Sequence, residues 1–163
     1  MATRGRIGLQ LKDGSVLSAY HHWDSYVEWL GKQLVEHYPT RDKVAELIDG
    51  GDMSSAYTNA GFNNETLPKS QPLYYTMRGE SLENNLPRLD ATLADYLNKD
   101  NGEEWHYLYT DKGWIAYQMN SFEKQDPEVV SIPTKLFFSL LRCTNSLRAM
   151  IIRKNILTSG MTL

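Results

Sequence analysis

An Asp-Gly pair at positions 13 and 14 constrains the fold of this chain more than any other sequence feature. It separates two runs with alternating apolar and polar residues, residues 4–12 and 15–24. A two-residue type I′ turn requires a positive φ, which glycine adopts readily, so this pattern is the strongest short-range signal for a β-hairpin. We therefore expect a hairpin in which Lys12 lies opposite Ser15.

This register assigns the hairpin side chains to two faces, because opposed residues in an antiparallel pair share a side. One face is largely apolar and would pack on the core. The other face is mixed, and it suits either a ligand-facing surface or an ordinary solvated sheet face. The core face carries Ile7, Leu9, Leu11, Val16, Ser18 and Tyr20, and the mixed face carries Arg4, Arg6, Gly8, Gln10, Lys12, Leu17, Ala19, His21 and Trp23.

Helical patterns follow the hairpin. Ser25 stands three residues before Glu28, the spacing of a capping box, and apolar residues then recur at three-to-four spacing over residues 26–38. Thr40 caps a second, shorter helix. A third helix is expected over residues 91–98.

A second hairpin is expected over residues 104–120, around Asp111-Lys112-Gly113, where the glycine suits a three-residue loop with a bulge. Before it, residues 52–72 read as a long polar loop, followed by a short strand over residues 73–77. These patterns together predict an α+β fold, an antiparallel sheet built from two β-hairpins with two to four helices packed mainly on one face.

Charge divides the chain into two parts. The first 128 residues contain 12 basic and 20 acidic side chains, whereas the last 35 contain five basic side chains and no acidic ones. We expect a compact domain over residues 1–122 and a basic carboxyl-terminal extension over residues 123–163, partly helical near residues 136–156. The extension could be a packed helix, an arm that contacts another subunit, or a segment that binds an acidic surface.

Cysteine content and hydropathy indicate the compartment. A single cysteine, Cys143, excludes an internal disulfide and is typical of a reducing environment. The amino terminus leads directly into a predicted strand, without the apolar segment of a secretory signal, and no run reaches the roughly 18 apolar residues that span a bilayer. We therefore expect a cytoplasmic protein.

No group of residues in the sequence predicts a catalytic centre or a metal site. His21 and His22 are neighbours in a strand and would point to opposite faces, so they would not chelate one ion together with Asp24. Cys143 has no neighbouring histidine, no nucleophile elbow or phosphate-binding loop is present, and Glu103 reads as part of a solvated turn. We assign no catalytic residue, no metal ligand and no cofactor.

Tyrosine and tryptophan make up 14 of the 18 aromatic residues. Both residue types dominate binding hot spots and stack on planar ligands. In the expected register a strip of cations and rings would run across the mixed face and suit a nucleotide or an acidic loop of a partner. The alternative is that most of these rings belong to the core and its rim. The candidate binding residues are Arg4, Arg6, His21, His22, Trp23, Asp24, Tyr26 and Arg78.

The opening Met1-Ala2-Thr3-Arg4, the Asp-Gly hairpin and the box His22-Trp23-Asp24-Ser25-Tyr26 resemble a family of small, uncharacterised bacteriophage proteins. Members of that family begin Met-(Ala/Gly)-Thr-Arg and carry an aromatic-Asp-Gly-Tyr-Pro box. The resemblance covers about the first 55 residues. It implies a phage origin, a place in the cytoplasm of the infected bacterial host and an accessory role, and it supplies no catalytic residues.

Three functions are compatible with the sequence. The first is a non-enzymatic phage accessory protein that binds and neutralises a host target or signalling molecule, for host takeover or against a defence system. The second is a small-molecule or nucleotide hydrolase that uses His21 or His22 with Asp24, and the third is a minor virion component. The expected partner is a host protein or a nucleotide-like small molecule, with no membrane, no nucleic acid on the acidic body, and a homo-oligomer as a possible assembly.

Overall fold

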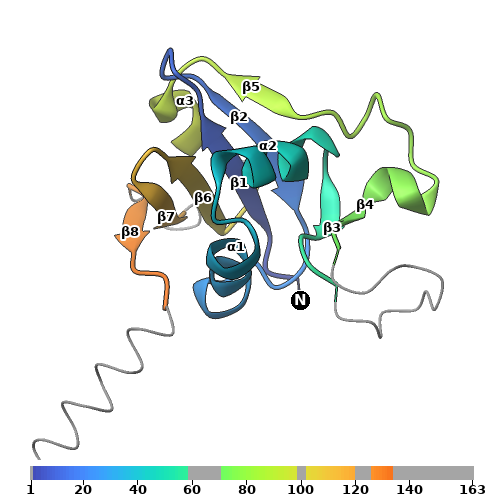
Figure 1. Ribbon diagram of the computed structural model, residues 1–163, viewed down its shortest axis with the longest axis horizontal. Helices are drawn as coiled ribbons and strands as arrows, with labels where there is room; N and C mark the ends of the chain where they lie inside the picture. Colours follow the sequence, from blue (N-terminus) through green and yellow to red (C-terminus); the bar gives the residue numbers. More distant parts are fainter. Residues whose placement is uncertain (1, 59–70, 99–101, 120–125, 134–163) are drawn as a thin grey trace, which may run out of the picture. The chain divides into compact units, whose positions relative to one another are not determined.

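The computed structural model describes residues 2–58, 71–98, 102–119 and 126–133. A mixed eight-stranded sheet forms its centre, with the order β4-β3-β2-β1-β6-β7-β8 and with β5 paired to β2 (Figure 1). The strands are β1 Gly5–Gln10, β2 Val16–His21, β3 Met53–Ser55, β4 Leu73–Tyr74, β5 Arg88–Asp90, β6 Trp105–Thr110, β7 Gly113–Gln118 and β8 Glu128–Val130. The helices are the π-helix η1 Val27–Gly31, α1 Lys32–His37, α2 Arg41–Asp49, the 3₁₀ helix η2 Tyr75–Arg78 and α3 Leu93–Leu97.

The α+β class is confirmed, but the sheet is mixed rather than antiparallel. Two hairpins do form it, β1 with β2 and β6 with β7. They are joined by a parallel pairing of β1 with β6, and β3 also runs parallel to β2. Each hairpin follows from a turn signal in the local sequence. The pairing of β1 with β6 joins residues far apart in the chain, and no local sequence pattern predicts it.

The first hairpin forms in a register that differs by one residue from the expected one. The Leu11 N–H donates to the Ser15 carbonyl oxygen at 2.8 Å, so the turn has three residues and Gly14, with φ of 89°, is its third. The Asp13 carboxylate accepts hydrogen bonds from the Ser15 amide at 3.0 Å and the Ser15 hydroxyl at 2.6 Å. Such a side-chain bond to the residue two positions on stabilises the three-residue turn over the two-residue one.

The change of register exchanges the two faces of β2 relative to β1. Arg6 lies opposite Tyr20. His21 follows Tyr20 in the strand and therefore points to the other face of the sheet, where only 1% of its surface is exposed. The predicted strip, which needed Arg6 and His21 on the same mixed face, is therefore wrong, because a shift of one residue moves every side chain of a strand to the opposite face.

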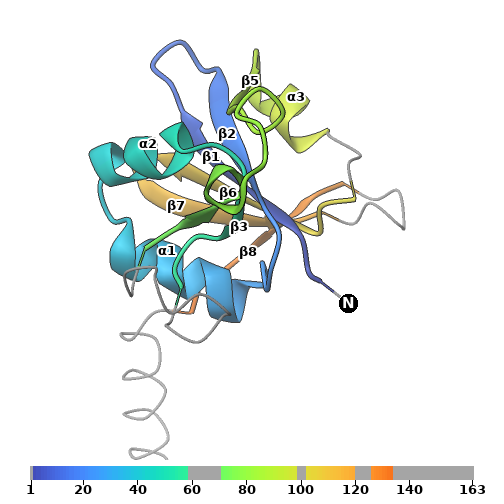
Figure 2. The same ribbon diagram turned by 90° about the vertical axis from the view of Figure 1, so that its right-hand side faces the viewer.

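Helices cover both faces of the sheet. Figure 2 shows α1 and α2 on one side and α3 on the other, whereas the sequence favoured one face. The larger core, on the side of α1 and α2, includes Ile7, Leu9, Ala19, Leu30, Leu34, Val44, Leu47 and Ile48. The smaller core, on the side of α3, contains Val16, Tyr96, Leu108, Tyr117 and Met119.

The helix expected over residues 26–38 forms as η1 followed by α1, without the predicted capping box. Tyr26 is the residue before η1, and it makes no side-chain capping bond. The Ser25 hydroxyl is buried and lies 2.7 Å from Nδ1 of His21, so its polar group is used inside the core. A capping box does form at α3, between Thr92 and Asp95, where it was not predicted.

Two three-residue strands at the edge of β2 were not expected. β3 lies inside the predicted loop over residues 52–72. β5 forms directly before the third helix, so α3 begins at Leu93. Strands of this length contain too little alternation to be recognised in a sequence.

The chain divides into two units, Met1–Ile132 and Pro133–Leu163. The first unit reaches past the expected boundary at residue 122, because β8 pairs with β7. The helix expected near residues 136–156 and Cys143 lie outside the described residues. None of the helices in the described ranges has the length and apolar character of a membrane span.

Candidate functional site

A cluster of four aromatic rings lies at the end of β2, beside η2. Tyr20 and Tyr75 stack with their ring centroids 6.5 Å apart and their planes at 19°. The His22 ring lies 6.0 Å from Tyr20 and 6.4 Å from Tyr75. Trp23, which is 43% exposed, meets His22 edge-on at 4.8 Å. We call Tyr20, His22, Trp23 and Tyr75 the aromatic patch.

Backbone hydrogen bonds hold the segments of the aromatic patch together. The Asp52 carboxylate accepts a hydrogen bond from the Tyr20 amide at 2.7 Å, and the Asp52 carbonyl accepts one from the Tyr75 amide at 3.1 Å. The His22 amide donates to the Met53 carbonyl at 3.1 Å. The backbone that carries the patch is therefore supported by β2, β3 and η2 together.

Two arginines bring positive charge to the aromatic patch. The Arg78 guanidinium lies 5.7 Å from the centroid of the Tyr75 ring, a distance at which a cation is attracted to the ring face. Burial, and then the charges of Arg4 and Arg78, lower the pKa of His22, so this imidazole is neutral at pH 7. Its Nδ1 lies 2.9 Å from the Tyr20 hydroxyl. Neither arginine side chain forms an ion pair with any residue that the structure describes.

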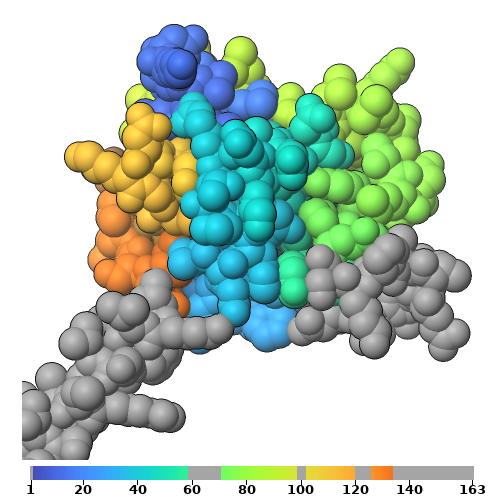
Figure 3. Space-filling view, in the orientation of Figure 1, coloured from blue at the N-terminus to red at the C-terminus, as the bar shows by residue number. Residues whose placement is uncertain are grey.

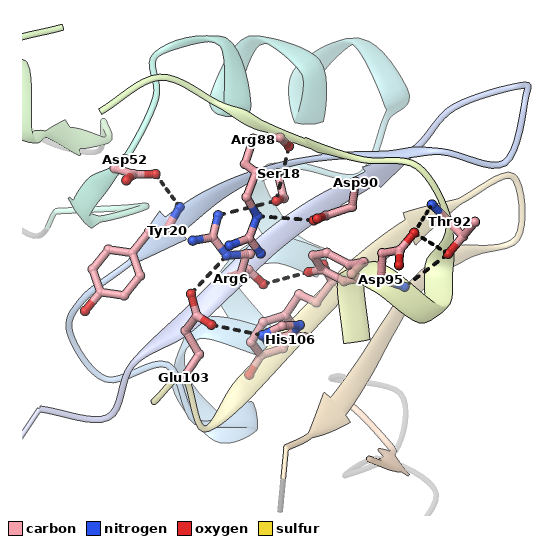
Figure 4. Close-up of polar contacts among 12 residues, drawn as sticks. Arg6, Ser18, Tyr20, Asp52, Arg88, Asp90, Thr92, Asp95, Glu103 and His106 are labelled. Atoms are coloured by element: carbon pink, nitrogen blue, oxygen red, sulfur yellow. Dashed lines mark hydrogen bonds and ion pairs between the residues drawn. The ribbon is translucent and has the colours of Figure 1, made fainter. Parts of the chain in front are cut away.

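A buried polar network borders the patch on the α3 side of the sheet (Figure 4). Arg6 Nε donates to Glu103 Oε1 at 3.0 Å, and Glu103 Oε2 lies 3.5 Å from His106 Nε2. The exposed fractions are 7% for Arg6, 1% for Glu103 and 0% for His106. Arg6 also reaches the Ser18 hydroxyl at 3.4 Å. Glu103 is thus not part of a solvated turn, as the sequence suggested, but the anion that holds Arg6 inside the fold.

The protonation states in this network follow from its burial. Burial raises the pKa of Glu103, but the 3.5 Å contact with His106 and the charge of Arg6 outweigh it and bring the pKa below its usual value. Burial lowers the pKa of His106 by more than Glu103 raises it. At neutral pH the network therefore holds an ionised Glu103 and Arg6 beside a neutral His106, and it links β1 to the start of β6.

The structure brings four of the eight expected binding residues to one place. Arg4, His22, Trp23 and Arg78 belong to the patch or to its charged border. Of the other four, Arg6 and His21 are buried on opposite faces of the sheet, Asp24 lies in the turn after β2 with φ of 54°, and Tyr26 is 36% exposed before η1.

Sequence reasoning missed Tyr20 and Tyr75. The shifted register assigned Tyr20 to the core, and Tyr75 was read as part of a strand. One signal was present: Tyr74 and Tyr75 are adjacent, and neighbouring residues of an extended chain point to opposite sides. In the strand expected over residues 73–77, these two tyrosines would therefore lie on opposite faces, and only one of them could pack on the core.

One of the two histidines that the hydrolase hypothesis paired with Asp24 has a different partner. His21 Nδ1 lies 2.7 Å from the Ser25 hydroxyl, with both residues buried, and burial lowers the pKa of His21 to about 3. No described contact joins Asp24 to His21 or His22. Within the described ranges, no group of three or more histidine, cysteine, aspartate or glutamate side chains is placed to hold a metal ion.

No protein-family model matches the chain, and no curated protein or solved structure matches it either.

Proposed function

We propose that this chain is a non-enzymatic bacteriophage accessory protein that binds and neutralises a nucleotide-like signalling molecule of its host through the aromatic patch. The observation that carries the proposal is the exposed Trp23 ring beside His22, with the Arg78 guanidinium 5.7 Å from the Tyr75 ring and without an ion-pair partner among the described residues. The charge of Arg4 also acts on His22, whose pKa it lowers. Guanidinium groups are the side chains best suited to phosphate, because their planar donors match its oxygens.

The rings of the aromatic patch would bind the base of the nucleotide. Trp23 is 43% exposed and is held edge-on against His22, so it can present a ring to a planar base. Burial raises the pKa of Tyr75 to about 12, so this phenol remains neutral and does not repel an anion. A base on the aromatic patch and phosphate groups at the two arginines would use the whole site.

Binding without turnover is favoured by the positions of the groups that could transfer protons. His21, Glu103 and His106 are each 1% exposed or less. A general base must come within hydrogen-bond reach of the proton that it abstracts. The partly exposed imidazole of the aromatic patch, His22, already contacts the Tyr20 hydroxyl. The phage origin and the location in the host cytoplasm rest on the resemblance of the first 55 residues, and they form part of the proposal.

Native mass spectrometry of the full chain, purified from bacterial cells that express it, tests this function. We expect a retained molecule whose fragments include a nucleobase, and we expect calorimetry to show binding of the same nucleotide when it is added to stripped protein. Arg78→Ala and Trp23→Ala should each weaken binding roughly tenfold or more, as expected for the loss of a charged hydrogen bond or a stacking ring. Lys112→Ala, in the exposed turn between β6 and β7, is the matched control and should bind normally.

Two results would count against the proposal. A retained host protein without any small molecule would favour inhibition of a protein target. Recovery of the nucleotide in hydrolysed form, with loss of that turnover in His22→Ala, would favour an enzyme.

A further inference from the structure

A cavity of about 450 Å³ opens on the side of the sheet that carries α1 and α2. Figure 3 shows this side, with α1 and α2 in blue to teal beside the green segment of β4 and η2. The volume falls in the range of small-molecule sites. Six of its lining side chains carry the argument: His37, Tyr38, Lys43, Glu46, Tyr57 and Tyr74. We call it the tyrosine pocket. It shares no residue with the aromatic patch.

Two walls of the tyrosine pocket are aromatic rings in fixed positions. The Tyr38 hydroxyl donates to the Ala56 carbonyl, and the Tyr74 hydroxyl donates to the Leu47 carbonyl at 3.0 Å. Tyr74 also packs directly on Gly50, where an added Cβ would lie 2.1 Å from the ring. Because both hydroxyls are occupied by the backbone, these rings offer the cavity their apolar surfaces.

A third aromatic element borders the cavity. His37 and Tyr57 stack face to face, with centroids 3.7 Å apart and planes at 1°. This pair joins the end of α1 to the chain that follows β3. It adds a flat wall against which a planar ligand can pack.

The polar groups of the tyrosine pocket carry opposite charges. Lys43 and Glu46 are three residues apart on α2 and therefore share one face of that helix. Neither forms an ion pair with another residue in the described ranges. A cation and an anion beside an aromatic cavity are complementary to a ligand that carries a carboxylate, an ammonium group and a ring.

We infer that the tyrosine pocket binds a small aromatic zwitterion of the aromatic α-amino acid class. The ring lies between the Tyr57 and Tyr74 walls, the carboxylate faces Lys43 and the ammonium group faces Glu46. This site stands apart from the proposed function, because the groups that it uses are different from those that bind the nucleotide.

Four probes separate the contributions of the ligand groups. L-Phenylalanine has all three groups, phenylacetate lacks the ammonium, phenethylamine lacks the carboxylate and L-alanine lacks the ring. Ligand-observed NMR titration of the full chain should show saturable binding of L-phenylalanine and at least roughly tenfold weaker binding of the other three, since each lacks one charged or stacking contact.

Variants assign each contact to a residue. Lys43→Met should abolish the preference for L-phenylalanine over phenethylamine, and Glu46→Gln should abolish its preference over phenylacetate. Tyr57→Ala should weaken binding of all the ring-bearing probes. Lys112→Met and Asp42→Asn remove exposed charges outside the cavity and should leave binding unchanged. Circular dichroism of each variant confirms that it is folded.

Three outcomes would overturn the inference. The first is the absence of saturable L-phenylalanine binding to the folded protein. The second is equal binding of all four probes, which would show that the charges play no part. The third is binding that is lost in Trp23→Ala but retained in Tyr57→Ala, which would assign the ligand to the aromatic patch.

Discussion

Gly8 of β1 lies directly against Tyr96 of α3, so that a Cβ added at Gly8 would lie 2.9 Å from Cζ of the Tyr96 ring. Tyr96 is fully buried, and its hydroxyl lies 3.1 Å from the Arg6 carbonyl oxygen and 3.0 Å from that of Tyr107. A short helix thus contacts β1 and β6 through one ring, and the absence of a side chain at Gly8 makes the approach possible.

We expect Gly8→Ala to lower the free energy of unfolding by about 1–3 kcal/mol, because the added methyl group forces the Tyr96 ring or the strand to move. Tyr96→Phe keeps the ring and removes only the hydroxyl, so its effect should be near 1 kcal/mol. Urea denaturation followed by circular dichroism measures both. A neutral Gly8→Ala would show that the ring is not tightly packed on β1.

Glu103→Gln should destabilise the fold by about 3–5 kcal/mol, since it leaves the buried Arg6 without an anionic partner. The matched control is Asp111→Asn, which breaks the exposed ion pair of Asp111 with Arg41 at 3.4 Å. Exposed pairs of this kind contribute little, and we expect no measurable change. Equal losses in the two variants would contradict a special role for the buried pair.

The pKa of about 3 for His21 predicts a pH dependence of stability. Between pH 6.5 and that value the unfolded chain binds a proton that the folded chain excludes, so the free energy of unfolding falls as the pH is lowered. One such group contributes at most about 1.4 kcal/mol per pH unit. His22 and His106 also have lowered pKa values and contribute in the same direction.

His21→Asn isolates the share of His21, because asparagine places an amide near the Nδ1 position, within reach of Ser25, and does not titrate. The variant should show a shallower loss of stability between pH 7 and pH 4.5 in urea denaturation. Parallel curves for the variant and the unchanged protein would rule out His21 as a source of the pH dependence.

Thr92→Ala should cost about 1 kcal/mol, because the Thr92 hydroxyl accepts a hydrogen bond from the Asp95 amide at 3.1 Å and caps α3. Thr92→Ser keeps the hydroxyl and should restore most of the loss in the same thermal melt. An equally destabilised serine variant would indicate that the threonine methyl group, rather than the cap, is responsible.

Local signals accounted for much of the fold. Gly14 and Gly113 adopt positive φ where the hairpins were predicted, and Thr40 caps α2 through a hydrogen bond from the Lys43 amide. The three-residue loop expected in the second hairpin is wrong, because Gly113 pairs with Thr110 and the turn consists of Asp111 and Lys112 alone. The register of the first hairpin was wrong because the bond from Ser15 to Asp13 selects the longer turn, and a glycine at the same place fits both turns. Local sequence patterns therefore predicted which strands and helices form better than they predicted the register in which the strands pair.

The candidate site was predicted only in part, for a physical reason. Trp23 and His22 lie close together because they are adjacent, but Tyr75 and Arg78 reach them through β3, which no pattern indicated. Arg6 and Glu103 are 97 positions apart in the chain. Which residues meet across such a distance depends on the strand order, and a single sequence carries no local mark of it.

The parallel pairing of β1 with β6 has a consequence for the newly made chain. Gly5 pairs with Trp105 and Leu9 with Tyr109, so the first hairpin leaves the ribosome long before its neighbour in the sheet exists. Until then one edge of β1 exposes unpaired amides and carbonyls, which invite pairing with other nascent chains. Pairings between distant residues also slow folding. We expect recovery of soluble protein to depend on slow translation or on chaperones that shield this edge until residue 109 has emerged.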